Sequence, residues 1–292
     1  MTNIHPSAIV SPNARLGKNA RIGPYSIIED HVEIGDDCTI AARVSVKTGT
    51  RMGSQNVVHE GCVLGGASQH LNSHGSSGKL VIGDHNTIRE NATMHLALDQ
   101  ADSTTVGSFN TVMVGAHLGH DAQVGNHCII VNNALLGGHV ILDDHAYLSG
   151  GVAVHQYCRV GTYAFVSGPA RIIQDVPPYV TVDGSTSKVV GLNTIGLRRN
   201  GFEDRQIAEL KAAYRLIFRG DLEWHELLTE LHTTFPTGPA SEFRNFIQSS
   251  QRGFLRERRR HNATTLRIFK PSVPDGASAS PNQSTPPRHR AA

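Results

Sequence analysis

The sequence predicts a mainly β fold, a parallel β-helix built from six-residue repeats, followed by a small helical domain. An aliphatic residue returns at every sixth position from Ile4 to Ile172, apart from two interruptions. A fixed period of six is typical of a hexapeptide β-helix, in which each repeat supplies one short strand. The column consists of Ile4, Val10, Leu16, Ile22, Ile28, Ile34, Ile40, Val46, Met52, Val58, Leu64, Ile82, Ile88, Met94, Val106, Val112, Leu118, Val124, Ile130, Leu136, Leu142, Leu148, Val154, Val160, Val166 and Ile172.

Two neighbouring positions support the same repeat. The residue after the aliphatic one is often glycine, which permits tight corners between short strands. The residue two places before it is usually small, most often alanine. Three repeats would close one triangular coil, so we expect residue n to lie beneath residue n+18, about 4.8 Å away. A β-sandwich, the structural alternative, predicts irregular turn spacing instead of one continuous period.

The two interruptions, near residues 66–79 and 96–104, are rich in Gly, Ser, Asp or His and are expected to be loops extruded from the rod. Near residue 201 the spacing of apolar residues changes to that of an amphipathic helix. We therefore expect a hexapeptide-repeat domain over 1–190, a helical domain over 191–260 and a disordered tail over 261–292.

Composition excludes several classes of protein. A net charge of +2 does not indicate a nucleic-acid partner. We find no signal-peptide pattern and no apolar run long enough for a membrane span, so we expect a cytoplasmic protein. The cysteines all occupy the small inward position, which predicts buried free thiols in a reducing compartment instead of disulfides or a metal site. They are Cys38, Cys62, Cys128 and Cys158.

Histidines are numerous, 17 in the chain, and those in the regular repeats avoid the inward positions. For any single one, a solvated or interface histidine is the ordinary interpretation. The n+18 rule, however, places Gly138 above His120 and Gln156 above Gly138. Three further imidazoles lie next to or near these positions in the sequence and extend the strip, namely those of His117, His139 and His155.

The strip has the groups that acyl transfer to a hydroxyl requires. His120 can act as general base near neutral pH, and Asp121 can orient it and stabilise its charged form. A free N–H at Gly138 could stabilise an oxyanion. Because no Gly-x-Ser-x-Gly motif is present and the cysteines are expected to point inward, we expect direct attack by the acceptor hydroxyl.

A zinc enzyme is the competing class. β-helical carbonic anhydrases use three histidines shared between subunits, two of them five residues apart. No two histidines of this chain differ by five positions, and His117 and His120 differ by three. We therefore expect no metal at the site.

Several motifs in order resemble the acyl-carrier-protein–UDP-N-acetylglucosamine O-acyltransferase family of lipid A biosynthesis. The resemblance covers about residues 1–255. The motifs are AHLGHD at 116–121, VGN at 124–126, NNA at 132–134, GGHV at 137–140, AVHQYC at 153–158, QDVPPY at 174–179, GLN at 191–193 and GLRRNGF at 196–202.

The resemblance implies a left-handed parallel β-helix that forms a homotrimer, with active sites between subunits. It also implies transfer of a 3-hydroxyacyl group from acyl carrier protein to the 3-hydroxyl of UDP-N-acetylglucosamine. No cofactor of its own is implied, since phosphopantetheine arrives on the carrier protein. By the same resemblance, His120 is the general base, Asp121 its partner and Gly138 the oxyanion donor.

The resemblance also implies roles for the remaining site residues. His117, His139 and His155 would line the sugar and pantetheine, and Gln156 would contact the acetamido group. Asn193 and Arg199 would contact the nucleotide or the carrier protein. Gly168 would lie at the end of the acyl-length ruler, where a glycine leaves room for a longer chain.

Some positions depart from the family pattern. His70 and Asn72 stand where Asp and Lys are common, Leu96-Ala97-Leu98 replaces Arg-Gly-Thr, and Ile195 and Asn200 replace Glu and Arg. These changes fall on substrate-binding positions, so the acceptor could be another UDP-sugar or UDP-amino-sugar, and the chain a divergent paralogue. Sugar N-acyltransferases of this fold carry an extra N-terminal domain, for which we see no room, and a non-catalytic scaffold or carrier-binding module is disfavoured by the His/Asp/Gly strip.

Overall fold

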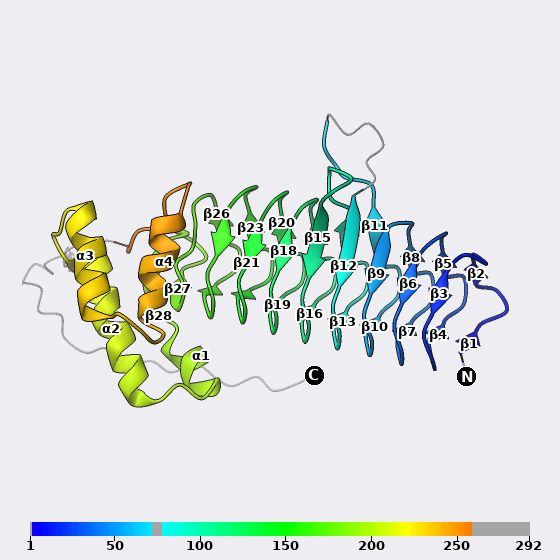
Figure 1. Cartoon of the computed structure of the whole chain (residues 1–292), viewed down its shortest axis with the longest axis horizontal. Coiled ribbons are helices and arrows are strands. Elements are labelled where there is room, and N and C mark those ends of the chain that lie inside the picture. The colour runs from blue at the N-terminus through cyan, green and yellow to red at the C-terminus, as the bar shows by residue number, and fades with distance from the viewer. Residues whose placement is uncertain (1, 72–77, 259–292) are drawn as a thin grey trace, which may run out of the picture. The chain divides into compact units, whose positions relative to one another are not determined.

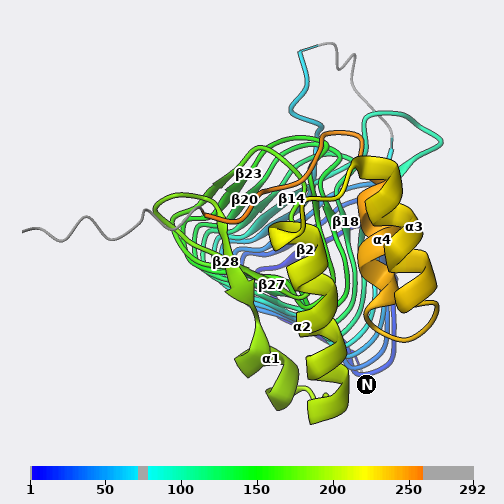
Figure 2. The same ribbon diagram turned by 90° about the vertical axis from the view of Figure 1, so that its left-hand side faces the viewer.

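The computed structural model describes residues 2–71 and 78–258. Residues up to Arg258 form one compact unit, a left-handed parallel β-helix followed by four helices (Figure 1). Seen along the coils, the β-helix has three faces, each made by one parallel sheet (Figure 2). The predicted fold class is therefore confirmed. The predicted disordered tail over 261–292 lies outside the described residues.

The three sheets, here called A, B and C, take every third strand of the chain until the last two strands, which both join sheet A and pair antiparallel to each other. Sheet A contains β1 (Asn3–Ile4), β4 (Arg21–Ile22), β7 (Thr39–Ile40), β10 (Val57–Val58), β13 (Thr87–Ile88), β16 (Thr111–Val112), β19 (Ile129–Ile130), β22 (Tyr147–Leu148), β25 (Phe165–Val166), β27 (Val180–Val182) and β28 (Val189–Leu192). Sheet B contains β2 (Ile9–Val10), β5 (Ile27–Ile28), β8 (Ser45–Val46), β11 (Val63–Gly66), β14 (Thr93–His95), β17 (His117–Leu118), β20 (Leu135–Leu136), β23 (Ala153–Val154) and β26 (Arg171–Ile172). Sheet C contains β3 (Arg15–Leu16), β6 (Glu33–Ile34), β9 (Thr50–Met52), β12 (Lys79–Ile82), β15 (Ser103–Val106), β18 (Gln123–Val124), β21 (Ile141–Leu142) and β24 (Arg159–Val160).

The strands are short because each six-residue repeat must also contain a corner. The second residue of most strands is the aliphatic one and points inward, so its burial against the next coil stabilises the stack. Small residues fill the remaining interior, among them the four cysteines, which are all buried and unpaired as predicted. Corner residues often have a positive φ, including Asp121 (φ 61°), His139 (φ 58°) and Tyr157 (φ 63°), which are stacked in successive coils.

The register follows the n+18 rule in the regular coils and departs from it at the two extruded loops. His117 pairs with Leu135, as predicted. Val57, in contrast, pairs with Thr87, which is 30 positions later, and Thr93 pairs with His117, which is 24 positions later. Both separations are multiples of six, and this explains why the aliphatic phase is unchanged while the pairing shifts.

The two extruded loops lie side by side. The Leu96 N–H donates to the Gly66 carbonyl at 2.8 Å, and His95 Nδ1 lies 2.7 Å from the Ala67 carbonyl oxygen. Both loops project from the rod at neighbouring places in Figure 2. They therefore extend the wall of the rod on the side that carries the predicted site.

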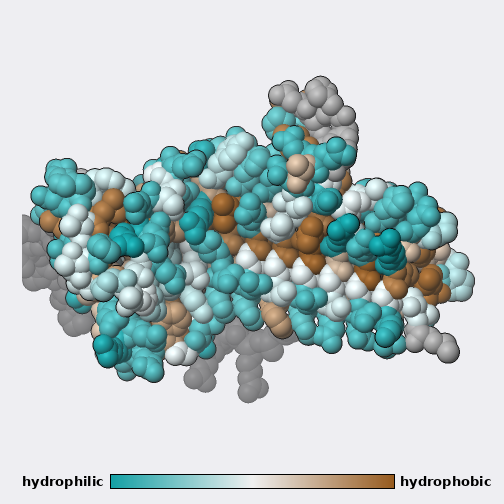
Figure 3. All heavy atoms as spheres, viewed as in Figure 1, coloured by the Kyte–Doolittle hydropathy of each residue, from teal (hydrophilic) through white to brown (hydrophobic). Residues whose placement is uncertain are grey.

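The helical part consists of α1 (Thr194–Arg199), α2 (Asp204–Arg219), α3 (Trp224–Thr234) and α4 (Ser241–Ser249), all within the stretch predicted to be helical. Residues Glu203 and Glu223 begin α2 and α3 with capping boxes. No helix in the described part of the chain is long and apolar enough to cross a membrane. In the view of Figure 3 a narrow apolar band runs along the rod, while the helices present mainly hydrophilic surface.

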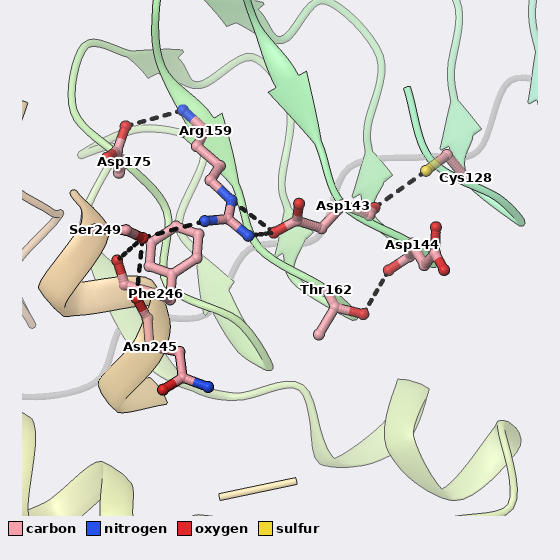
Figure 4. A network of polar contacts seen from close by, with 9 residues as sticks. All are labelled: Cys128, Asp143, Asp144, Arg159, Thr162, Asp175, Asn245, Phe246 and Ser249. Carbon is pink, nitrogen blue, oxygen red and sulfur yellow. Dashed lines mark hydrogen bonds and ion pairs between the residues drawn. The ribbon is translucent and has the colours of Figure 1, made fainter. Parts of the chain in front are cut away.

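Helix α4 is fastened to the last coils by a polar network around Arg159 (Figure 4). The guanidinium binds the Asp143 carboxylate through Nε and Nη2, at 2.9 and 2.8 Å, and lies 4.7 Å from the centre of the Phe246 ring. The backbone N–H of Arg159 donates to Asp175, whose other oxygen accepts from Ser250 at 2.7 Å. Helix α4 is thus joined to the β-helix by the Arg159–Phe246 contact and by the hydrogen bond from Ser250 to Asp175.

Candidate active site

A cavity of about 720 Å³ lies on the outer face of sheet B, between the rod and the first extruded loop. It is lined by residues of β17, β20, β23 and β26 together with the corners that follow β17, β20 and β23. The structure thus brings most of the predicted strip into one place. The predicted site residues that line the cavity are His70, His117, His120, Gly138, His155 and Gln156.

His120 and Asp121 form a tightly bonded pair at the edge of this cavity. Nδ1 of His120 lies 2.6 Å from Oδ2 of Asp121. The Leu98 N–H donates to both carboxylate oxygens, at 3.1 and 3.3 Å, and the Asp121 N–H donates to Thr104 Oγ1 at 2.8 Å. An ionised carboxylate only accepts, so Nδ1 carries the proton and Nε2 is left as an acceptor.

The pair is less exposed than the repeat pattern alone suggests. Both residues point away from the coil interior, as predicted, but each is only 8% exposed. The cause is the second extruded loop, which folds over the pair: the Leu98 N–H donates to the carboxylate, and Thr104 Oγ1 accepts from the Asp121 backbone N–H. A loop from another coil therefore covers a pair that the repeat places on the outside of the rod.

Gly138 lies directly above His120 and has no space for a side chain. A Cβ atom there would lie 2.6 Å from both Nε2 and Cε1 of the His120 ring. The residue is buried, yet its N–H donates no hydrogen bond within the described part of the chain. Buried unpaired N–H groups are rare in folded proteins, so this donor is available to a bound group.

His139 approaches the same carboxylate from the next coil. Its Nε2 lies 3.6 Å from Asp121 Oδ2, and its ring is stacked on Tyr157 with centroids 4.5 Å apart. The ligand atoms of His120, Asp121 and His139 lie close enough together to hold a metal ion. Because His120 and Asp121 already bind each other, the same geometry also fits a carboxylate that is shared by two imidazoles without a metal.

His117 and His155 line the same cavity as His120. His117 Nδ1 lies 2.9 Å from Thr93 Oγ1, and burial, with a smaller contribution from nearby His95, lowers the pKa of His117. It is therefore mainly neutral near pH 7. His155 is exposed, and its Nδ1 lies 3.1 Å from the backbone oxygen of Gln156. Both imidazoles present polar edges to the cavity.

His70 belongs to the first extruded loop and packs edge-on against His120, with ring centroids 5.5 Å apart. It thus contacts the pair directly, although it departs from the family pattern. Asn72, the other altered residue of this loop, lies outside the described residues. The second altered segment, Leu96 to Leu98, also contacts the pair through the Leu98 N–H.

Five of the described site residues that the sequence predicts do not line this cavity, among them Asp121 and His139, which line a neighbouring one of about 440 Å³. Asn193 and Arg199 line a different one, of about 580 Å³, together with His127, His145 and Tyr163. The Asn193 side chain caps α1, accepting from Gly196 N–H at 3.0 Å and donating to the Tyr163 carbonyl at 2.9 Å. Within one protomer these residues and His120 therefore belong to separate cavities.

Gly168 has a different reason to be glycine than the expected room for an acyl chain. The direction in which its Cβ would point is occupied by the carbonyl oxygen of Gly150 in the preceding coil. Close packing of two backbones therefore requires glycine at this position. The structure gives no support within the protomer to the expected space for a longer chain.

Sequence reasoning missed several residues of the site. The sequence does not predict that Leu98 and Thr104 bond to Asp121, or that Tyr157 and Arg171 lie at the site. Arg171 follows His117, Leu135 and Ala153 in one outward column, and all four line the cavity. Applying the n+18 rule to His117 as well as His120 would have found it.

The fold and the site together define a class, the acyltransferases built on hexapeptide repeats. Within that class the chain belongs to the acyl-[acyl-carrier-protein]–UDP-N-acetylglucosamine O-acyltransferase family. Residues 175–255 match the family model described as "Udp N-acetylglucosamine O-acyltransferase; Domain 2". Enzymes of that name from Halorhodospira halophila and Ectopseudomonas mendocina are 42% and 43% identical, over 88% of this chain and 100% of each relative.

Solved structures agree with this assignment. The UDP-N-acetylglucosamine acyltransferase of Francisella novicida superimposes with a TM-score of 0.84 at 34% identity, covering 87% of this chain and 94% of that one. The enzyme of Bacteroides fragilis gives a TM-score of 0.83 at 38% identity, covering 86% and 99%.

Proposed function

We propose that this protein transfers a 3-hydroxyacyl group from acyl carrier protein to the 3-hydroxyl of UDP-N-acetylglucosamine, the first step of lipid A biosynthesis. One observation carries the proposal. An imidazole bonded through Nδ1 to a buried carboxylate lies beside an unpaired glycine N–H, in one cavity on the rod. Membership of the acyltransferase family supplies the substrates.

In the proposed reaction, Nε2 of His120 accepts the proton of the acceptor hydroxyl as its oxygen attacks the thioester carbonyl carbon. Asp121 stabilises the imidazolium that forms. The Gly138 N–H donates to the negative oxygen of the tetrahedral intermediate. The carbon–sulfur bond then breaks, and the leaving thiolate takes the proton from Nε2, which restores the neutral imidazole.

We further propose that His117, His139, His155 and Gln156 line the bound sugar and pantetheine. The chain would need no cofactor of its own and would act in the cytoplasm as a homotrimer. Two features support a trimer: the apolar band along the rod, and the location of Asn193 and Arg199 in a separate cavity. If those two residues contact the nucleotide, they would do so for the active site of a neighbouring subunit.

A second candidate differs only in the acceptor, which would be another UDP-sugar or UDP-amino-sugar. The observation that favours it is the contact of both altered loops with the catalytic pair. His70 packs on the His120 ring, and the Leu98 N–H binds Asp121. Changes at such positions can alter which acceptor is held in reach of His120.

The test is incubation of the purified protein with 3-hydroxyacyl carrier proteins and a panel of UDP-sugars, with products identified by mass spectrometry. We expect acylated UDP-N-acetylglucosamine from the parent protein, and at least a ~100-fold lower rate from His120→Ala. Acylation of a different UDP-sugar would select the second candidate. A fully active His120→Ala variant, or no acylated product from any acceptor, would overturn the proposal.

A further inference from the structure

The cavity on sheet B has an unusual distribution of charge. Its lining residues include no aspartate, glutamate or lysine, and the single arginine among them is Arg171. The imidazoles that line it are polar groups with donor and acceptor edges, and the lowered pKa of His117 keeps that ring neutral near pH 7. The Arg171 guanidinium is therefore the one permanent charge on the described wall of this cavity.

Arg171 is located at the end of an outward column. His117 pairs with Leu135, Leu135 with Ala153, and Ala153 with Arg171, so the column rises through three coils. Three coil spacings correspond to about 14 Å along the rod. One extended ligand whose reacting group lies at His120 could therefore place another group beside Arg171.

The guanidinium of Arg171 has no intramolecular partner in the described part of the chain. Several other arginines of the protein are paired, for example Arg159 with Asp143 and Arg219 with Glu257, each at 2.8 Å. For Arg171, in contrast, only the backbone N–H is engaged, donating to Ser187 Oγ at 3.0 Å. The residue is exposed, and its five N–H donors remain free to bind an anion.

We propose that Arg171 binds a phosphate group of a substrate at the far end of this cavity and so determines substrate affinity. A guanidinium matches a phosphate with two parallel hydrogen bonds, and because no carboxylate lines this cavity, none of its lining residues competes for the charge. The inference rests on the proposed function, which supplies two phosphate-bearing ligands. These are the nucleotide diphosphate and the phosphopantetheine arm.

The experiment compares the parent protein with Arg171→Gln, Arg171→Lys and the control Arg21→Gln. Arg21 is also the exposed first residue of a strand, but it lies on sheet A, in the first coils. Binding of UDP-N-acetylglucosamine, of an acyl-phosphopantetheine and of the matching acyl-pantetheine without phosphate is measured by calorimetry at low and high salt. KM values for the nucleotide sugar and the acyl carrier protein are measured in parallel.

We expect Arg171→Gln to weaken binding of one phosphate-bearing ligand by about 10- to 100-fold, as for loss of a charge-assisted hydrogen bond. Arg171→Lys should recover part of the affinity, and Arg21→Gln should behave as the parent. The salt dependence of binding should also decrease in Arg171→Gln.

The ligand that is affected identifies the source of the phosphate. Weaker binding of the nucleotide sugar alone assigns Arg171 to the diphosphate. Weaker binding of acyl-phosphopantetheine, with acyl-pantetheine unchanged, assigns it to the prosthetic arm. Affinities of all ligands within twofold of the parent overturn the inference. Because calorimetry needs no turnover, this failure can be distinguished from failure of the proposed reaction, which would appear as an inactive parent protein.

Discussion

The ring of His120 occupies the position into which a side chain at Gly138 would project: a Cβ there would lie 2.6 Å from Nε2. The proposed base can therefore hold its position only because the proposed oxyanion donor has no side chain. Gly138→Ala should force the ring away from Asp121 and lower kcat by about 10- to 1,000-fold, the range seen when such groups are misplaced or lost.

The measurement for Gly138→Ala is steady-state kinetics beside a thermal melt. We expect a folded protein with impaired kcat and a smaller change in KM. Gly191→Ala is a suitable control, since a Cβ there meets no atom within 4 Å. Parent-like kcat in Gly138→Ala would show that the ring and the glycine N–H are not used together.

Removal of metal should leave activity unchanged. His120, Asp121 and His139 could hold an ion, but the proposed reaction uses His120 Nε2 as a base and Asp121 as its partner. Dialysis against EDTA, followed by metal analysis and a transfer assay, is the check. Loss of activity that zinc restores would instead favour the metal-dependent class considered from the sequence.

Breaking the Arg159 network should loosen the attachment of α4 (Figure 4). Arg159→Met removes the cationic partner of Asp143. Burial raises the pKa of the Asp143 carboxyl, and Arg159 opposes this effect. We expect the free energy of unfolding to fall by about 1–3 kcal/mol, the cost of leaving a part-buried charged group without its partner. Denaturant melts of Arg159→Met, Asp143→Asn and the double variant give the coupling energy. If the loss of unfolding free energy in the double variant equals the sum of the two single losses, the result argues against a direct pair.

The thiols inside the rod should resist modification while the protein is folded. Burial raises the pKa of Cys128 to about 12 and those of Cys62 and Cys158 to about 11. Almost no thiolate, the reactive form, is then present near pH 8. We expect negligible reaction with a disulfide reagent in buffer and full reaction in denaturant. Rapid native labelling of any of these thiols would mean that its coil opens locally.

Acid should destabilise the protein through two histidines. Burial, with a smaller effect of His127, lowers the pKa of His145, and burial likewise lowers that of His117. The unfolded state then binds more protons than the folded state, so stability is lost as pH falls below the ordinary histidine value of about 6.5. Melting temperatures between pH 7.5 and 5.5 measure the effect.

His145→Phe should flatten this pH dependence while retaining the ring stack with Tyr163, whose centroid is 4.3 Å away. His225→Gln, a change at an exposed position of α3, should leave the slope as in the parent. An unchanged slope in His145→Phe would remove this residue from the explanation.

The sequence by itself determined the β-helix, because every repeat carries its own inward aliphatic residue and its own corner. It also placed His120 beneath Gly138, since both lie in coils of regular length. It could not reveal that Leu98 holds the Asp121 carboxylate, or that Thr93, not residue 99, lies beneath His117. Those contacts depend on how many residues each extruded loop takes out of the coil.

Only the tertiary structure decided which outward residues became a site. The period of six turns a side chain away from the interior but does not say what will cover it. The path of the loops buries His120 and Asp121, the corner of the next coil leaves the Gly138 N–H unpaired, and the column ending at Arg171 closes the cavity. A local repeat fixes the direction of each residue, whereas burial, pairing and charge at the site come from segments distant in the chain.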